Sequence, residues 1–127
     1  MVVAIDFDGT VVSWKYPKVG EDIGAVPVLK DLVEAGHKII LCTMRDGQPL
    51  EEAKKWFEDN DIPLWAINRN PSQWTWSKSK KIHANLYIDD QALGAPLIYP
   101  GGGERPYLDW LKVRELLVNL GYVKGDS

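Results

Sequence analysis

The chain has 127 residues, a net charge of −3, 45% hydrophobic and 26% charged residues, and one cysteine, Cys42. This length suits one domain over residues 1–127, and the composition is ordinary for a water-soluble globular protein. No apolar run reaches the roughly 18 residues that a membrane span needs, the signal-peptide pattern is absent, and a lone cysteine excludes an internal disulfide. We therefore expect a cytoplasmic protein, and the charge weakly disfavours a broad polyanion-binding surface.

Short apolar runs alternate with helical patterns along the chain. In chain order, the apolar runs predict strands at residues 2–5, 38–43, 64–67, 86–88 and 96–99. Apolar residues at helical spacing predict helices beginning near Pro27, Pro49 and Leu108. Residues 11–24 and 68–80 are predicted to be loops. Strands joined by helices imply parallel pairing through right-handed crossovers, so the fold class is predicted to be α/β.

Two acidic residues directly follow the first strand, in the run Asp6-Phe7-Asp8-Gly9-Thr10. Because a strand has a period of two, both acidic side chains point the same way. Two acids on one side of a strand end repel each other and lose solvation, so they need a cation between them or a retained proton. Gly9 and Thr10 supply a tight turn and hydrogen-bonding groups. This layout is typical of a catalytic site at the carboxyl end of a parallel strand.

Further polar residues fall at or near the ends of later strands. Thr43 closes the second strand, Asp89 and Asp90 close the fourth, and Lys81 lies shortly before the fourth. The carboxyl ends of parallel strands meet at one edge of a sheet. We therefore expect Thr43 and the later acidic pair to converge with the acidic pair of the first strand.

Together these motifs resemble those of the haloacid dehalogenase (HAD) superfamily of phosphatases. The superfamily's Asp-x-Asp-Gly-Thr motif, its strand ending in Thr or Ser, and its later acidic pair are matched in order by residues 6–10, 39–43 and 86–90. Its lysine has two candidates, Lys81 and Lys80, and Lys81 is favoured because it lies eight residues before the acidic pair. The resemblance extends to about residue 99 and implies a three-layer, Rossmann-like HAD domain with a parallel sheet of about five strands.

The resemblance also implies catalytic roles. Asp6 would attack phosphorus and form an aspartyl-phosphate, and Asp8 would serve as general acid and base. A neighbouring second carboxylate would favour a proton on Asp8. Thr43 and Lys81 would bind the phosphoryl oxygens, where charge stabilisation lowers the barrier.

Metal and substrate ligands follow from the same resemblance. Mg²⁺ would be held by Asp6, by the backbone carbonyl of Asp8 and by Asp89, with Asp90 acting through water or hydrogen bonds. The candidate substrate-binding residues are the neighbours of these groups, namely Gly9, Thr10, Met44 and Arg45. For Arg45, a solvated turn arginine is an equal alternative.

The spacing of the motifs predicts an uncovered site. Only 34 residues lie between Asp8 and Thr43, and only 37 lie between Thr43 and Lys81. Members of the superfamily carry cap domains in these two intervals, and neither interval has room for one. We therefore expect a capless domain whose open site suits a large substrate, or a small one enclosed by a partner subunit.

The leading interpretation is a Mg²⁺-dependent phosphatase that acts on a small phosphorylated substrate. A nucleotidase or a nucleic-acid 3′-end phosphatase is an alternative, because Trp74 and Trp76 flank Lys78, Lys80 and Lys81 in a pattern that could stack bases. The simpler interpretation of these tryptophans is packing of the loop onto the domain edge. The glycine run at residues 101–103 is interpreted as a flexible connector.

Two interpretations from another functional class remain open. Phospho-acceptor signalling domains also combine an acidic cluster, a Thr or Ser and a Lys on an α/β sheet. Their phosphorylated Asp lies at a middle strand, whereas here the Asp-x-Asp motif follows the first strand, so the order disfavours signalling. A catalytically inactive binding module is hard to reconcile with all four motifs being present.

Overall fold

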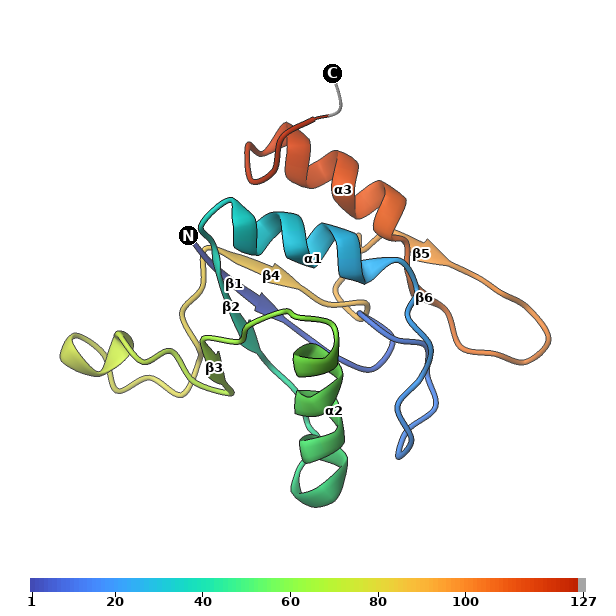
Figure 1. Cartoon of the computed structure of the whole chain (residues 1–127), viewed down its shortest axis with the longest axis horizontal. Helices are drawn as coiled ribbons and strands as arrows, with labels where there is room; N and C mark the ends of the chain where they lie inside the picture. The colour runs from blue at the N-terminus through green and yellow to red at the C-terminus, as the bar shows by residue number, and fades with distance from the viewer. Residues whose placement is uncertain (126–127) are drawn as a thin grey trace.

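The computed structural model describes residues 1–125. Its centre is a parallel sheet of four strands in the order β3-β2-β1-β4 (Figure 1). The strands are β1 (Val2–Ile5), β2 (Lys38–Leu41), β3 (Ala66–Ile67) and β4 (Leu86–Ile88). The predicted α/β, Rossmann-like fold class is therefore confirmed.

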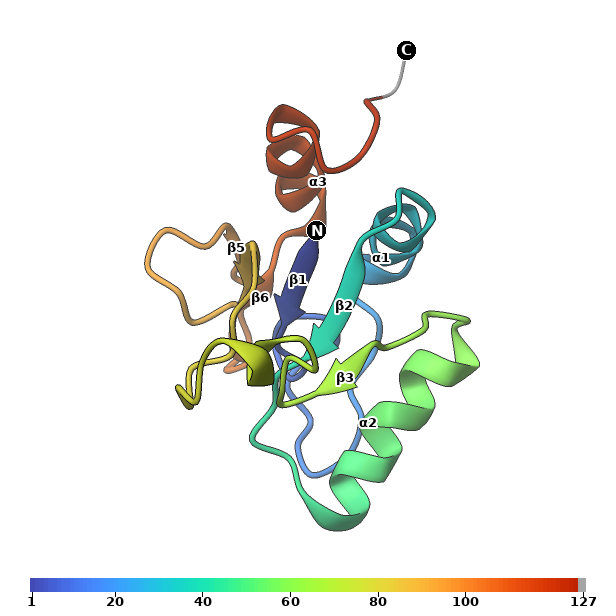
Figure 2. The ribbon, with the colours of Figure 1, turned by 90° about the vertical axis from the view of Figure 1, so that its left-hand side faces the viewer.

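Helices cover one face of the sheet (Figure 2). α1 (Ala25–Glu34) joins β1 to β2, and α2 (Gly47–Asp59) joins β2 to β3. Both connections step the same way across the sheet, so right-handed crossovers place both helices on the same face. α3 (Trp110–Asn119) packs beside α1. From β3 the chain returns across the sheet to β4, at the opposite edge. This connection is a loop that contains the short 3₁₀ helix η1 (Gln73–Thr75), and it forms the third layer.

The alternation of side chains along β1 explains why its motif folds as it does. Val3, Ile5 and Phe7 are fully buried in the main core. The Phe7 ring lies 5.9 Å, centroid to centroid, from each of the Trp56 and Phe57 rings of α2. A buried phenylalanine between two acids thus anchors the motif to the helical layer.

The predicted fifth strand is not part of the parallel sheet. β5 (Leu97–Ile98) instead pairs antiparallel with β6 (Tyr107–Leu108) in a separate two-stranded sheet. Only residues 89–96 separate β4 from β5, which is too short for the crossover of about a dozen residues that a parallel neighbour needs. The parallel sheet therefore has four strands rather than about five.

The glycine run lies in the connection between β5 and β6. Gly101, Gly102 and Gly103 all have positive φ angles, of 79°, 64° and 80°. Three consecutive residues in this region strongly favour glycine. The run therefore connects the two strands of this hairpin.

Among the described residues, the carboxyl-end edge of the sheet carries no inserted domain. The interval between β1 and β2 contains a loop and α1, and the interval between β2 and β4 contains α2, β3 and the loop layer. Within residues 1–125, no helix has the length and apolar character needed to cross a membrane.

Candidate functional site

Three of the predicted acidic residues come together at the carboxyl ends of β1 and β4. Asp6, Asp89 and Asp90 each offer a carboxylate oxygen within 4.8 Å of the others. The two strands are neighbours with Ile5 paired to Ile88, so the acids that follow them meet. From β1 the chain continues to β2 on one side, whereas the later strand β4 pairs with β1 on its other side. The strand order therefore reverses at β1, and open α/β sheets bind ligands at such a switch point.

The hydroxyl of Thr10 contacts two of these acids, Asp6 and Asp90. Its Oγ1 lies 3.1 Å from Oδ2 of Asp6 and 2.9 Å from Oδ1 of Asp90, and it accepts a hydrogen bond from the Asp90 backbone N–H. The Thr10 side chain is fully buried, and its carbonyl accepts a hydrogen bond from Nε1 of Trp110. The predicted contact between Thr10 and substrate is therefore wrong, because Thr10 lies below the acids and orients them.

Gly9 also has a structural role in place of the predicted substrate contact. It is buried, with a φ angle of 78°. A Cβ atom at this position would clash with Nε1 of Trp14 and with Oδ2 of Asp90. Only glycine lets the Trp14 indole and the acidic cluster approach the same stretch of backbone.

Ionisation of the carboxyl groups in the acidic cluster is disfavoured. Burial raises the pKa of Asp6 to about 7, with further upward contributions from Asp89 and Asp90 that outweigh hydrogen bonds from the Phe7 backbone and Thr10. Burial likewise raises the pKa of Asp90. Within residues 1–125, no Lys or Arg nitrogen lies within 4.0 Å of these carboxylates. A hard divalent cation, which prefers oxygen ligands, would supply the missing positive charge.

Cys42 lies close enough to this cluster to sense its charge. Burial raises the pKa of its thiol to about 11, and the charges of Asp6 and Asp89 add to this effect. The thiol is therefore protonated at neutral pH and is not an activated nucleophile.

Asp8 turns away from the acidic cluster and pairs with Arg45. Nε of Arg45 donates to Oδ2 of Asp8 at 2.8 Å, and Nη2 donates to Oδ1 at 2.7 Å. The neighbour of Asp8 is therefore a guanidinium and not the second carboxylate that the sequence suggested. The two groups form a bidentate pair.

Arg45 is fully engaged by the protein. Its remaining N–H groups donate to the backbone carbonyls of Pro17, Lys18 and Pro49 at 3.2, 2.8 and 3.0 Å. All five guanidinium donors thus have partners, and the residue is only 3% exposed. The alternative of a solvated turn arginine is therefore wrong, and the predicted substrate contact stays a prediction. Arg45, just after β2, thus joins the chain at that point to Asp8 and to the loop that follows β1.

An open cavity of about 680 Å³ lies over the site. Of the predicted residues, Asp6, Asp8, Thr43, Met44, Arg45 and Asp89 line it, together with Trp14, Tyr16, Gln91 and Arg105. Thr43 Oγ1 accepts a hydrogen bond from the Arg45 backbone N–H, and its own hydroxyl has no acceptor among residues 1–125. The Thr43 hydroxyl is thus available to a ligand, and Met44, 98% exposed, lies at the rim.

Neither candidate lysine lines this cavity. Nζ of Lys81 lies 5.5 Å from the centroid of the Tyr87 ring, and Lys80 lines a neighbouring cavity. In this structure Lys81 therefore lies over Tyr87 and not in the lining of the cavity, and its role in binding the phosphoryl oxygens stays a prediction. The sequence shows that a lysine lies shortly before β4, but residue spacing does not determine the path of the loop that carries this lysine.

Arg105 is a cation at the cavity that sequence reasoning missed. Its guanidinium carbon lies 3.6 Å from the centroid of the Trp14 ring, and within the described chain no carboxylate oxygen lies within 4.0 Å of it. It follows the glycine run, beyond the last recognisable motif. Only the hairpin of β5 and β6 brings it back over the site, so no motif spacing could have indicated it.

A solved structure is similar to this chain over most of its length. No family model matches the chain, and no curated protein matches it. The solved structure, described as a conserved protein coded by a locus from Bacteroides thetaiotaomicron, is similar with a TM-score of 0.74 and 34% sequence identity. The match covers 94% of this chain and 91% of that chain. The description of that protein states no activity.

Proposed function

The chain belongs to the same family as the conserved Bacteroides thetaiotaomicron protein, and from this starting point we propose that it is a divalent-cation-dependent phosphatase that hydrolyses phosphate monoesters. The observation that carries the proposal is the cluster of Asp6, Asp89 and Asp90 at the switch point of the sheet, beside the free hydroxyl of Thr43. Resemblance to the haloacid dehalogenase motifs supplies the reaction type.

The donor set of the acidic cluster fits Mg²⁺. Its ligand atoms are carboxylate oxygens, and the described residues supply no positive partner for them. Asp6, Asp89 and the backbone carbonyl of Asp8 would hold the ion, and Asp90 would support it through water or hydrogen bonds. When bound, the ion offsets the charge of the incoming phosphoryl group, which otherwise repels the acids.

The proposed reaction has two steps. First, a carboxylate oxygen of Asp6 attacks phosphorus while Asp8 donates a proton to the leaving oxygen, so the ester P–O bond breaks to give an aspartyl-phosphate and the alcohol. Water then attacks the same phosphorus and gives a proton to Asp8, which releases inorganic phosphate and restores Asp6. Asp8, held in place by Arg45, thus regains in the second step the proton that it gave in the first.

The hydrolysis of p-nitrophenyl phosphate tests this function. We expect repeated turnover in Mg²⁺, and we expect EDTA to lower the rate by roughly 100-fold or more because the ion supplies several kcal/mol of charge stabilisation. Sustained release of inorganic phosphate separates a phosphatase from a phospho-acceptor domain and from an inactive binding module. Equal rates in Mg²⁺ and EDTA would contradict the proposal.

Arg105 is proposed to bind the phosphoryl oxygens in place of the expected lysine. We expect Arg105→Met to raise the KM for p-nitrophenyl phosphate about tenfold, the usual worth of a charge-assisted hydrogen bond, with a smaller change in kcat. The inhibition constant of inorganic phosphate should rise by the same factor. Lys15→Met is the control, because exposed Lys15 contacts Glu104 of the same hairpin at 3.6 Å. An unchanged KM and unchanged phosphate inhibition in Arg105→Met would exclude this role.

A further inference from the structure

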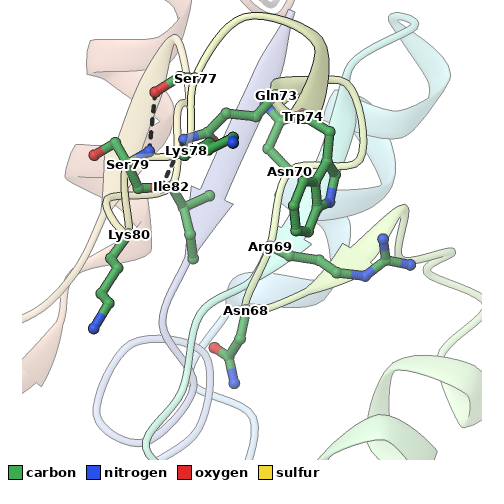
Figure 3. A pocket seen from close by; sticks show the side chains of 10 residues that line it. All are labelled: Asn68, Arg69, Asn70, Gln73, Trp74, Ser77, Lys78, Ser79, Lys80 and Ile82. Carbon is green, nitrogen blue, oxygen red and sulfur yellow. Dashed lines mark hydrogen bonds between the residues drawn. The ribbon is translucent and has the colours of Figure 1, made fainter.

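A second cavity, of about 330 Å³, lies between the end of β3 and the loop of residues 68–82 (Figure 3). A hydrogen bond links its lining to that of the proposed catalytic cavity. Asn68 lines the second cavity, and its Oδ1 accepts a hydrogen bond from the backbone N–H of Thr43 at 2.9 Å. Thr43 lines the first cavity. The proposed phosphatase reaction uses none of the side chains of the second cavity.

Positive charge is concentrated around the second cavity. Residues 62–88 contain Arg69, Lys78, Lys80 and Lys81 and no acidic residue, in a chain whose net charge is −3. The first three of these residues line the cavity. In the part of the chain that the structure describes, no carboxylate oxygen lies within 4.0 Å of any of the four. The loop therefore carries a local, unneutralised basic patch that favours anions.

The tryptophans of this loop face solvent. Trp74 is 73% exposed and Trp76 is 61% exposed. The simpler interpretation, packing onto the domain edge, is therefore wrong for Trp74, whereas the Trp76 ring packs against the His83 ring with 5.3 Å between centroids. Figure 3 shows Trp74 and Arg69 on one arm of the loop, with Lys80 on the returning arm. An exposed indole beside unpaired cations can stack a planar base while the cations contact phosphate.

Two buried amides hold the loop in this shape. Asn70, 4% exposed, donates to the carbonyl of His83 and accepts from the backbone N–H of Ser72. Gln73, 7% exposed, donates to the carbonyls of Ser79 and Lys81 and accepts from the backbone N–H of His83. The two arms of the loop are thus joined by side-chain hydrogen bonds. Trp74 and the cations are presented by a pre-formed frame, which lowers the ordering cost of binding.

We propose that this cavity binds single-stranded nucleic acid, with a base stacked on Trp74 and the phosphodiester backbone beside Lys78 and Lys80. The catalytic cavity, linked to it through Asn68 and Thr43, would then receive the phosphate at the strand end; this second part rests on the proposed phosphatase function, whereas binding does not. Both tryptophans are exposed and the four cations are spread over residues 69–81, so successive nucleotides of one strand can contact them.

Fluorescence anisotropy with a labelled single-stranded DNA oligonucleotide carrying a 3′-phosphate tests the binding, in EDTA to prevent turnover. We expect wild-type protein to bind with an affinity that falls as salt rises. Trp74→Ala should weaken binding about tenfold, and Lys78→Ala should weaken it and lower the salt slope by about one. Tyr99→Ala and Lys54→Ala are matched controls, since Tyr99 is 76% exposed and Lys54 lies on α2. Absent binding, or equal losses in the controls, would overturn the proposal.

Two further measurements distinguish this proposal from the proposed function. Oligonucleotide binding without phosphate release from either the oligonucleotide or p-nitrophenyl phosphate would refute the phosphatase and leave the nucleic-acid site standing. Hydrolysis of p-nitrophenyl phosphate without oligonucleotide binding would refute the nucleic-acid site alone. Thymidine monophosphate that competes as well as the oligonucleotide would also overturn it, because the patch would then serve one nucleotide.

Discussion

Asp6→Asn is expected to lower the turnover of p-nitrophenyl phosphate by roughly 10⁴-fold or more, the scale seen when a catalytic nucleophile is removed. The amide has the shape of the carboxylate but supplies neither its nucleophilic charge nor a strong oxygen ligand for Mg²⁺. Initial rates at saturating Mg²⁺ measure the effect. Asp61→Asn is the control, because exposed Asp61 has a φ angle of 56° that asparagine also tolerates. Comparable rates in Asp6→Asn and Asp61→Asn would contradict the assignment.

The pH dependence of stability shows whether Asp6→Asn remains folded. Folding raises the pKa of Asp6 to about 7, from 3.8, so between about pH 4 and pH 7 the folded state holds a proton that the unfolded state has lost. Metal-free wild-type protein should therefore lose stability as pH rises through this window. Asp6→Asn lacks this loss and should melt at least as high as wild type at pH 8. A variant that melts clearly below wild type there would contradict the cause given for the shift.

Arg45→Met is expected to lower the free energy of unfolding by about 3–5 kcal/mol, the cost of leaving one member of a buried ion pair alone. The substitution leaves the buried Asp8 carboxylate without its bidentate partner and removes the donors to three backbone carbonyls. Because a domain of this size is stable by only about 5–15 kcal/mol, the loss is a large fraction of the total. Chemical denaturation measures it.

A matched ion pair elsewhere in the chain provides the control for Arg45. Arg114 contacts Asp31 at 2.8 Å, but its side chain is 28% exposed, so Arg114→Met should cost less than about 1 kcal/mol. Adding Asp8→Asn to Arg45→Met should recover part of the loss, because no unpaired charge then remains buried. If Arg45→Met costs no more than Arg114→Met, Arg45 does not hold the loops together as described.

The fold was predictable where local pattern alone decides structure. Apolar runs located the four parallel strands, and helical spacing located the three helices, because burial against a single core imposes those periods. The pairing of Leu97–Ile98 with Tyr107–Leu108 was not predicted, since antiparallel pairing of two-residue strands leaves almost no periodic signal. α3 begins at Trp110 rather than near Leu108 because Asp109 accepts hydrogen bonds from the backbone of the first turn.

The site was predictable only for residues fixed to strand ends. Asp6, Asp89 and Asp90 directly follow β1 and β4, so parallel pairing brings them together. The partners of Asp8 and of Trp14 come from segments far away in sequence. Arg45 reaches Asp8 across 37 positions, and Arg105 arrives on a hairpin after the last motif. Such contacts depend on the three-dimensional path of loops, which residue spacing does not encode.

Covalent catalysis by Asp6 can be measured directly by acid quenching of the wild-type protein during p-nitrophenyl phosphate turnover, followed by peptide mass mapping. We predict one phosphoryl group on the peptide that contains Asp6 and none on the same peptide of Asp6→Asn. The acid quench preserves the acyl phosphate that the second step would otherwise hydrolyse. A phosphoryl group on another residue, or none during a demonstrated burst of p-nitrophenolate, would contradict the role of Asp6 as nucleophile.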